Sequence, residues 1–109
     1  NQPGSLLRLA AVRAAGGPRR ELGLCMDLDL WLRVLATGAH HAVETEVATY
    51  RYHAASKTCA AADPFALEEY AVLHDLARSL GVEHPPALAA LRAAHPAPFV
   101  AFPSIPLSP

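Results

Sequence analysis

The strongest helical pattern in this chain lies at residues 63–80, which read Asp-Pro-Phe-Ala-Leu-Glu-Glu-Tyr-Ala-Val-Leu-His-Asp-Leu-Ala-Arg-Ser-Leu. Asp63 suits an N-cap and Pro64 the first helical position, while Arg78 and the following Gly81 are typical of a helix end. Apolar side chains recur at spacings of three and four, at Phe65, Leu67, Tyr70, Leu73, Leu76, Ala77 and Leu80. The pattern predicts a long helix whose apolar face needs a partner surface.

Other segments carry weaker signals. A second amphipathic helix is predicted from residue 26 or 27, with Leu28, Trp31, Leu32 and Leu35 on one face and Thr37-Gly38 as its end. Alanine-rich stretches predict short helices at 10–15, which ends at Gly16-Gly17-Pro18, and at 87–94, which follows Pro85-Pro86. Residues 5–9 are expected to form a strand, and residues 42–52 a short strand or an extended loop.

Composition excludes several classes of protein. The 109 residues are 52% hydrophobic and 17% charged, with a net charge of −1, so the chain is neither a disordered tail nor a typical nucleic-acid binder. Its apolar runs are far shorter than the roughly 20 residues that cross a bilayer, so no transmembrane segment is expected. Cys25 and Cys59 lie far apart in the sequence and outside any CxxC spacing, so we expect both to be reduced thiols. A cytoplasmic location is expected, and a peripheral position at the membrane stays open.

Two carboxylates lie close together at the start of the second helix, in the run Met26-Asp27-Leu28-Asp29. Side chains at i and i+2 of a helix point about 200° apart, so one metal ion could not be held by both. A single carboxylate, Asp27, could instead act as a general base at the loop-to-helix junction. The alternative is that Asp27 and Asp29 only cap the helix and favour its dipole.

The N-terminal part of the chain, up to about residue 60, resembles family 2 glycosyltransferases of the GT-A fold. The matching pieces occur in the family's order and spacing: Gln2-Pro3, Leu7-Arg8, Gly16-Gly17, residues 26–33, Tyr50-Arg51-Tyr52-His53 and Ser56-Lys57-Thr58. The resemblance implies an α/β fold, of which this chain would be a C-terminal fragment, mostly helical with a few short strands. It divides the chain into residues 1–60 of the catalytic domain, a helical extension at 61–95 and a proline-rich, extended tail at 96–109.

The same resemblance implies an activity and a set of site residues. The activity is inverting transfer of a sugar from a nucleotide-diphosphate donor to a hydroxyl of a glycan or lipid, as in the synthesis of cell-surface polysaccharides. Asp27 would be the catalytic base, and His53 a ligand of a divalent metal, Mn²⁺ or Mg²⁺. Arg51 and Lys57 would neutralise the diphosphate, and Gln2 would line the acceptor side. His53 could equally be a surface residue, and Arg51 and Lys57 solvated charges.

The chain starts at Asn1 without a methionine, and we interpret this as a cut inside a larger protein. The missing N-terminal half would bind the nucleotide, so the chain alone is expected to be inactive or nearly so. Trp31 is expected to pack in the core, and the remaining histidines, among them His74 and His95, share no spacing that would build a metal site. The rival hypothesis is a small non-catalytic interaction module that presents the apolar stripe of 64–80 to a partner.

Overall fold

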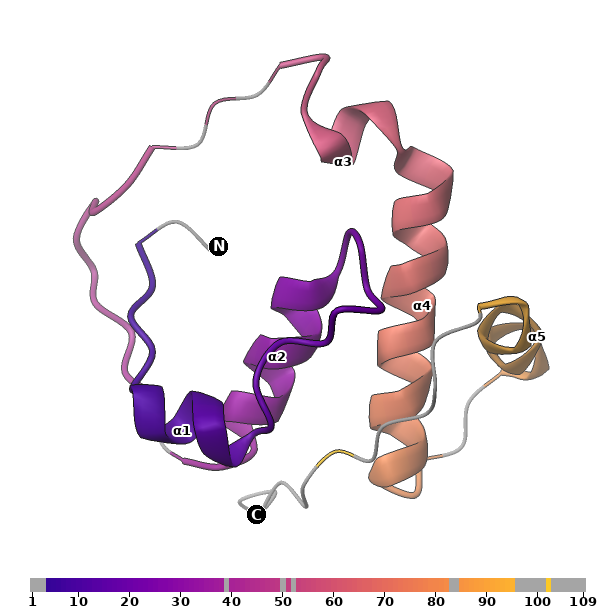
Figure 1. Ribbon diagram of the computed structural model, residues 1–109, viewed down its shortest axis with the longest axis horizontal. Helices are drawn as coiled ribbons and strands as arrows, with labels where there is room; N and C mark the ends of the chain where they lie inside the picture. Colours follow the sequence, from indigo (N-terminus) through magenta and orange to yellow (C-terminus); the bar gives the residue numbers. More distant parts are fainter. Residues whose placement is uncertain are drawn as a thin grey trace.

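The computed structural model describes residues 4–38, 40–49, 51, 53–82, 85–95 and 102. In this part of the chain the regular elements are helices (Figure 1). In chain order they are α1 (Leu9–Ala14), α2 (Met26–Leu35), α3 (Lys57–Ala60), α4 (Ala62–Ser79) and α5 (Pro86–Ala94). The helices predicted at 10–15, from residue 26 or 27 to Thr37-Gly38, at 63–80 and at 87–94 are therefore confirmed with small shifts of their ends, and α3 was not predicted.

The expected α/β class is wrong, because the described residues contain no strand and no sheet. Residues 5–8, expected to be part of a strand, and residues 42–49, expected to be a short strand or an extended loop, have no regular secondary structure. A strand exists only when it pairs with another strand, so β-branched residues such as Val43 and Val47 cannot form one alone. Both of these valines are exposed. The chain is accordingly not an α/β fragment of the GT-A fold.

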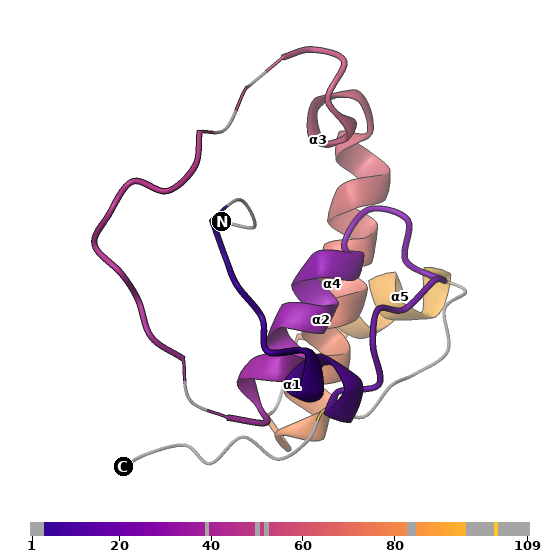
Figure 2. The ribbon, with the colours of Figure 1, turned by 60° about the vertical axis from the view of Figure 1, so that its left-hand side comes forward.

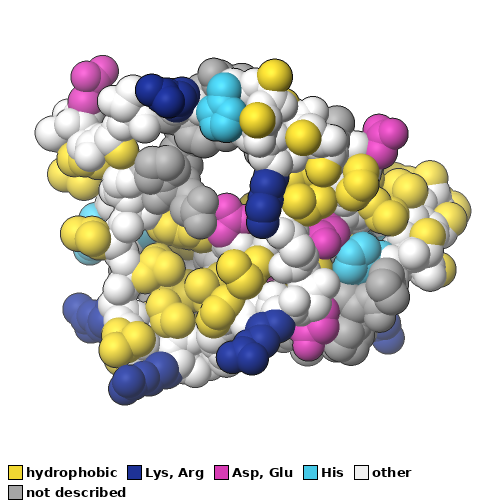
Figure 3. All heavy atoms as spheres, turned by 45° about the horizontal axis from the view of Figure 1, so that its top comes forward, with side chains coloured by type: hydrophobic (Ala, Val, Ile, Leu, Met, Phe, Trp, Pro, Cys, Tyr) yellow, Lys and Arg dark blue, Asp and Glu magenta, His cyan; other side chains and the backbone are white. Residues whose placement is uncertain are grey.

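α4 is the central element, with α2 packed against one side and α5 against another (Figure 1, Figure 2). α1 packs against α2, and α3 leads directly into α4. Residues 40–49 run outside this group of helices, and the space-filling view shows an opening through the molecule (Figure 3). The fold is therefore a small helical cluster with one long connection arching away from it.

The core is small and draws on distant parts of the chain. Its buried members are Leu22, Cys25, Val72 and Phe102. Partly buried hydrophobic residues pack around them: Leu24, Leu28, Leu32, Phe65 and Leu76. Two members of the α4 stripe, Phe65 and Leu76, thus pack inside the molecule, while Tyr70 and Leu73 are exposed. The most deeply buried apolar side chain of α4, Val72, was not predicted as part of the stripe. Phe102 belongs to the segment predicted as an extended tail, and the other residues of 96–109 lie outside the described part.

Glycine residues end two of the helices, as the sequence predicts. Gly16 and Gly81 each follow a helix with positive φ, 83° and 66°, a conformation that costs glycine little. After α4, the Gly81 N–H donates to the Arg78 carbonyl and the Val82 N–H to the Ala77 carbonyl, which is the Schellman pattern. The start of α4 differs from the prediction: the N-cap is Ala61, and Asp63 lies within the first turn.

No helix in the described part of the chain combines the length and the apolar character needed to cross a membrane.

Candidate functional site

Asp27 lies in the first turn of α2, whose N-cap residue is Cys25. Its carboxylate Oδ1 accepts a hydrogen bond from the backbone N–H of Leu28 at 2.9 Å. The side chain is half-buried and lines a cavity of about 290 Å³. The other lining residues are Ser5, Leu7, Pro18, Met26, Leu30 and Trp31, which make the walls mainly apolar. Asp27 is the ionisable side chain among them.

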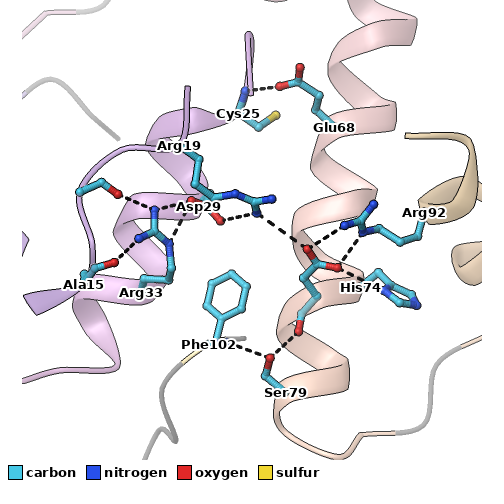
Figure 4. Close-up of polar contacts among 12 residues, drawn as sticks. Ala15, Arg19, Cys25, Asp29, Arg33, Glu68, His74, Ser79, Arg92 and Phe102 are labelled. Carbon is cyan, nitrogen blue, oxygen red and sulfur yellow. Dashed lines mark hydrogen bonds and ion pairs between the residues drawn. The ribbon is translucent and has the colours of Figure 1, made fainter. Parts of the chain in front are cut away.

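Asp29 lies two residues further along α2 and is fully buried. It accepts a hydrogen bond from Nε of Arg33 at 3.0 Å and one from Nη1 of Arg19 at 3.2 Å (Figure 4). Arg33 also donates to the carbonyls of Ala15 and Gly17, and so ties α2 to the end of α1. Asp29 therefore serves as the counter-ion of two buried guanidinium groups.

Glu68 of α4 holds the loop that leads into α2. Its Oε1 accepts the N–H of Gly23 at 2.9 Å, and its Oε2 accepts the N–H groups of Leu24 and Cys25 at 2.8 and 2.9 Å. Burial acts to raise the pKa of Glu68, but these three donors outweigh it and the pKa lies below its ordinary value. One carboxylate thus fixes the entry to the helix that carries Asp27. This role was not predicted, because Glu68 and the loop that it holds are distant from each other in the sequence.

Cys25 lies at the junction between this loop and α2. The thiol is fully buried and donates a hydrogen bond to the Phe65 carbonyl at 3.6 Å. Burial, together with the negative charges of Glu68, Glu69 and Asp27, raises its pKa to about 12. Cys25 is therefore a packing residue with a protonated thiol, while Cys59 is exposed. Both cysteines are free.

The other residues implicated by the sequence lie on a different part of the molecule. Arg51 and His53, in the segment that leads into α3, and Lys57, the first residue of α3, are exposed, and none of them lines the Asp27 cavity. Gln2 lies outside the described residues. No group of three or more potential metal ligands assembles in the described part of the chain. A lone exposed imidazole does not build a metal site, so we derive no chemical step through a metal.

Trp31 was expected to pack in the core, but it lines the same cavity as Asp27 and is only half-buried. An indole beside a carboxylate offers an apolar surface next to a proton acceptor, which suits an organic ligand that carries a hydroxyl group.

A second polar cluster lies between α4 and α5, where His74 and Asp75 meet Arg92 and His95. Its two histidines were judged incidental from the sequence, since residues 74 and 95 share no regular spacing. Only the packing of α5 against α4 brings them together.

The arrangement around Asp27 can accept a proton from a group held in the adjoining cavity. Comparisons with protein-family models, curated proteins and solved structures found no match for this chain.

Proposed function

We propose that this chain carries the catalytic base of an inverting glycosyltransferase, with Asp27 as that base. The proposal rests on one observation above all. Asp27 faces a cavity beside Trp31, while the neighbouring Asp29 is buried and engaged with two arginines. In this proposal Asp29 stabilises the fold, and Asp27 is the carboxylate that acts on the ligand. The proposal concerns the chemistry of Asp27 and involves no sheet in this chain.

The reaction needs one well-placed carboxylate. The oxygen of an acceptor hydroxyl attacks the anomeric carbon of the donor from the face opposite the leaving group. The new glycosidic C–O bond forms as the bond between the anomeric carbon and the diphosphate oxygen breaks, and the nucleotide diphosphate leaves with that electron pair. Asp27 takes the hydroxyl proton. A carboxylate has two oxygens, so the Leu28 N–H can orient one while the other receives the proton.

Donor binding is assigned to other residues. Arg51 and Lys57 would neutralise the diphosphate, because basic side chains stabilise charge that develops on phosphate oxygens. His53 would contribute to a divalent-metal site only together with ligands beyond the described residues, and Gln2 would contact the acceptor, a glycan or lipid. In this proposal a nucleotide-binding part of the same protein completes the site, and the reaction takes place on the cytoplasmic side of a membrane.

The test compares two aspartates that occupy the first turn of a helix. In the full-length natural protein, nucleotide-diphosphate release is measured with UDP-, GDP- and dTDP-sugars in the presence of membranes that carry acceptors. Asp27→Asn should lower kcat at least about a hundredfold, because an amide cannot take the proton. Asp63→Asn, in the exposed first turn of α4, should leave kcat within about twofold.

Wild-type activity retained by Asp27→Asn would overturn the assignment. An absence of sugar transfer with every donor would favour the interaction module instead. That rival has less surface than the sequence suggested, since Phe65 and Leu76 of the α4 stripe pack against the core, which leaves Tyr70 and Leu73 partly exposed.

A further inference from the structure

The cavity beside Asp27 is mainly apolar. Its volume is about 290 Å³, and most of the described residues that line it are hydrophobic: Leu7, Pro18, Met26, Leu30 and Trp31. We propose that the acceptor of the reaction is a neutral alcohol with an apolar chain, which places its hydroxyl at Asp27 and its chain along these walls. The inference rests on the proposed role of Asp27 as the base and adds the chemical class of the acceptor.

The helix α2 brings a carboxylate and an indole onto one face. Asp27 and Trp31 are four residues apart, as are Met26 and Leu30, and side chains at this spacing are neighbours on a helix surface. Leu7, from the segment before α1, lines the same cavity. An apolar chain that lies against the Trp31 ring therefore has its end group within reach of the Asp27 carboxylate.

Asp27 keeps one oxygen available for a ligand. Its Oδ1 accepts the N–H of Leu28, and the side chain has no other hydrogen-bond or ion-pair partner in the part of the chain that the structure describes. A hydroxyl group donates a single hydrogen bond, which Oδ2 can accept. The one open position on this carboxylate therefore matches a ligand with one hydroxyl.

A sugar acceptor would bring more polar groups than the walls can satisfy. A monosaccharide ring carries several hydroxyls, and each of them loses hydrogen bonds to water when it enters a cavity. Apart from Asp27, the polar residue of the described lining is Ser5, which has an interaction of its own. Buried hydroxyls without partners are unfavourable, so these walls favour a chain with one hydroxyl over a glycan.

The charge of the cavity disfavours a lipid phosphate. The two arginines nearest in the polar network, Arg19 and Arg33, donate to Asp29, and neither lines the cavity (Figure 4). An anionic head group would therefore meet the Asp27 carboxylate with no cation among the described lining residues. A neutral hydroxyl avoids this repulsion and can still give its proton to Asp27.

The experiment uses the fluorescence of Trp31, the only tryptophan among the 109 residues. The intact chain is titrated with n-butanol, n-hexanol, methyl glucoside and hexyl phosphate, at concentrations that leave its circular dichroism unchanged, and Trp31→Phe gives the background. Each buried methylene strengthens binding about fourfold, so hexanol should bind at least about tenfold more tightly than butanol. Methyl glucoside and hexyl phosphate should each bind at least about tenfold more weakly than hexanol.

Two leucines in the segment before α1 provide a matched pair of variants. Leu7 lines the cavity and Leu6 is fully exposed, and neither belongs to the core cluster. Leu7→Asn puts an amide in the apolar wall and should weaken hexanol binding about tenfold, whereas Leu6→Asn should stay within about twofold of wild type. Asp27→Asn removes the negative charge, so hexyl phosphate should then bind within about threefold of hexanol.

Hexanol binding that depends on chain length and is weakened by Leu7→Asn supports an apolar alcohol as the acceptor. Binding of methyl glucoside or hexyl phosphate as tightly as hexanol overturns the inference, and so does the absence of any Trp31 response to the alcohols. The titrations involve no sugar transfer, so such a failure leaves the assignment of Asp27 as the base standing. Failure of that assignment is measured separately, by the kcat of Asp27→Asn.

Discussion

Asp27 and Asp29 stand two residues apart on α2 and have opposite surroundings. Asp29 is fully buried between Arg19 and Arg33, and Asp27 lines an apolar cavity beside Trp31. The helical geometry explains the divergence, because side chains at i and i+2 point about 200° apart. Asp29 holds the helix in place, and Asp27 faces the cavity.

Removal of the fully buried charge of Asp29 should damage the fold far more than removal of the half-buried charge of Asp27. Asp29→Asn removes the counter-ion of Arg33 and the nearer of the two carboxylates that pair with Arg19, and should lower the free energy of unfolding by about 3–5 kcal/mol. Asp27→Asn weakens one hydrogen bond to a neighbouring N–H and should cost about 1 kcal/mol or less. Urea denaturation of both variants measures the difference. Equal losses would contradict the division of roles.

Glu68 should make the protein sensitive to acid. Its folded-state pKa lies below the ordinary value of 4.5, so its contribution to stability is complete above about pH 4.5 and is lost as the pH falls through the folded-state pKa. Glu68→Gln should lower the free energy of unfolding at pH 7 by about 1–3 kcal/mol, because the amide cannot accept all three N–H groups of the loop.

The same variant should then lose less stability than wild type between pH 5 and pH 3, as followed by thermal unfolding. Glu21→Gln changes an exposed glutamate and serves as the control, with an expected effect below about 0.5 kcal/mol. Parallel pH profiles for wild type and Glu68→Gln would refute the role of Glu68.

The two thiols should differ sharply in reactivity. Cys25 is fully buried with a pKa of about 12, whereas Cys59 is exposed, so a thiol reagent at pH 8 should label Cys59 quickly and Cys25 only as the protein opens. Cys59→Ser should abolish the fast phase. Because the pKa of Cys25 rises above its ordinary value of 9.0 on folding, the free energy of unfolding should also fall as the pH rises above about 9. Two fast-reacting thiols in the native state would argue against this packing.

Phe102 should be essential although it lies in a proline-rich segment. It is 5% exposed, contacts the core, and its N–H donates to the Ser79 hydroxyl at 2.9 Å. Phe102→Ala should therefore lower the free energy of unfolding by about 3–5 kcal/mol. Val82→Ala, at an exposed position after α4, should cost less than about 0.5 kcal/mol. Differential scanning calorimetry measures both effects. If Phe102→Ala lowers the free energy of unfolding by less than about 1 kcal/mol, the core does not depend on this residue.

The sequence alone determined the main helices, because helix formation depends on residues that are close together in the sequence. Apolar spacing of three and four residues located α2 and α4, and glycines able to adopt positive φ located the ends of α1 and α4. The strand expected at 5–9, and the strand alternative at 42–52, were wrong for the complementary reason. A high β-propensity means only that a residue fits well in a sheet. A strand forms only where a second strand lies alongside to pair with it.

The surroundings of each site residue were decided by the tertiary structure. The i, i+2 rule predicted that Asp27 and Asp29 diverge, but the positions of Arg19 and Arg33 decided which of them is buried. Glu68 meets the loop before α2 although the two are distant in the sequence, and α5 brings His95 towards His74. Such contacts depend on how the helices pack and not on any local sequence pattern. The charged residues can therefore be read from the sequence, but the pairs that they form cannot.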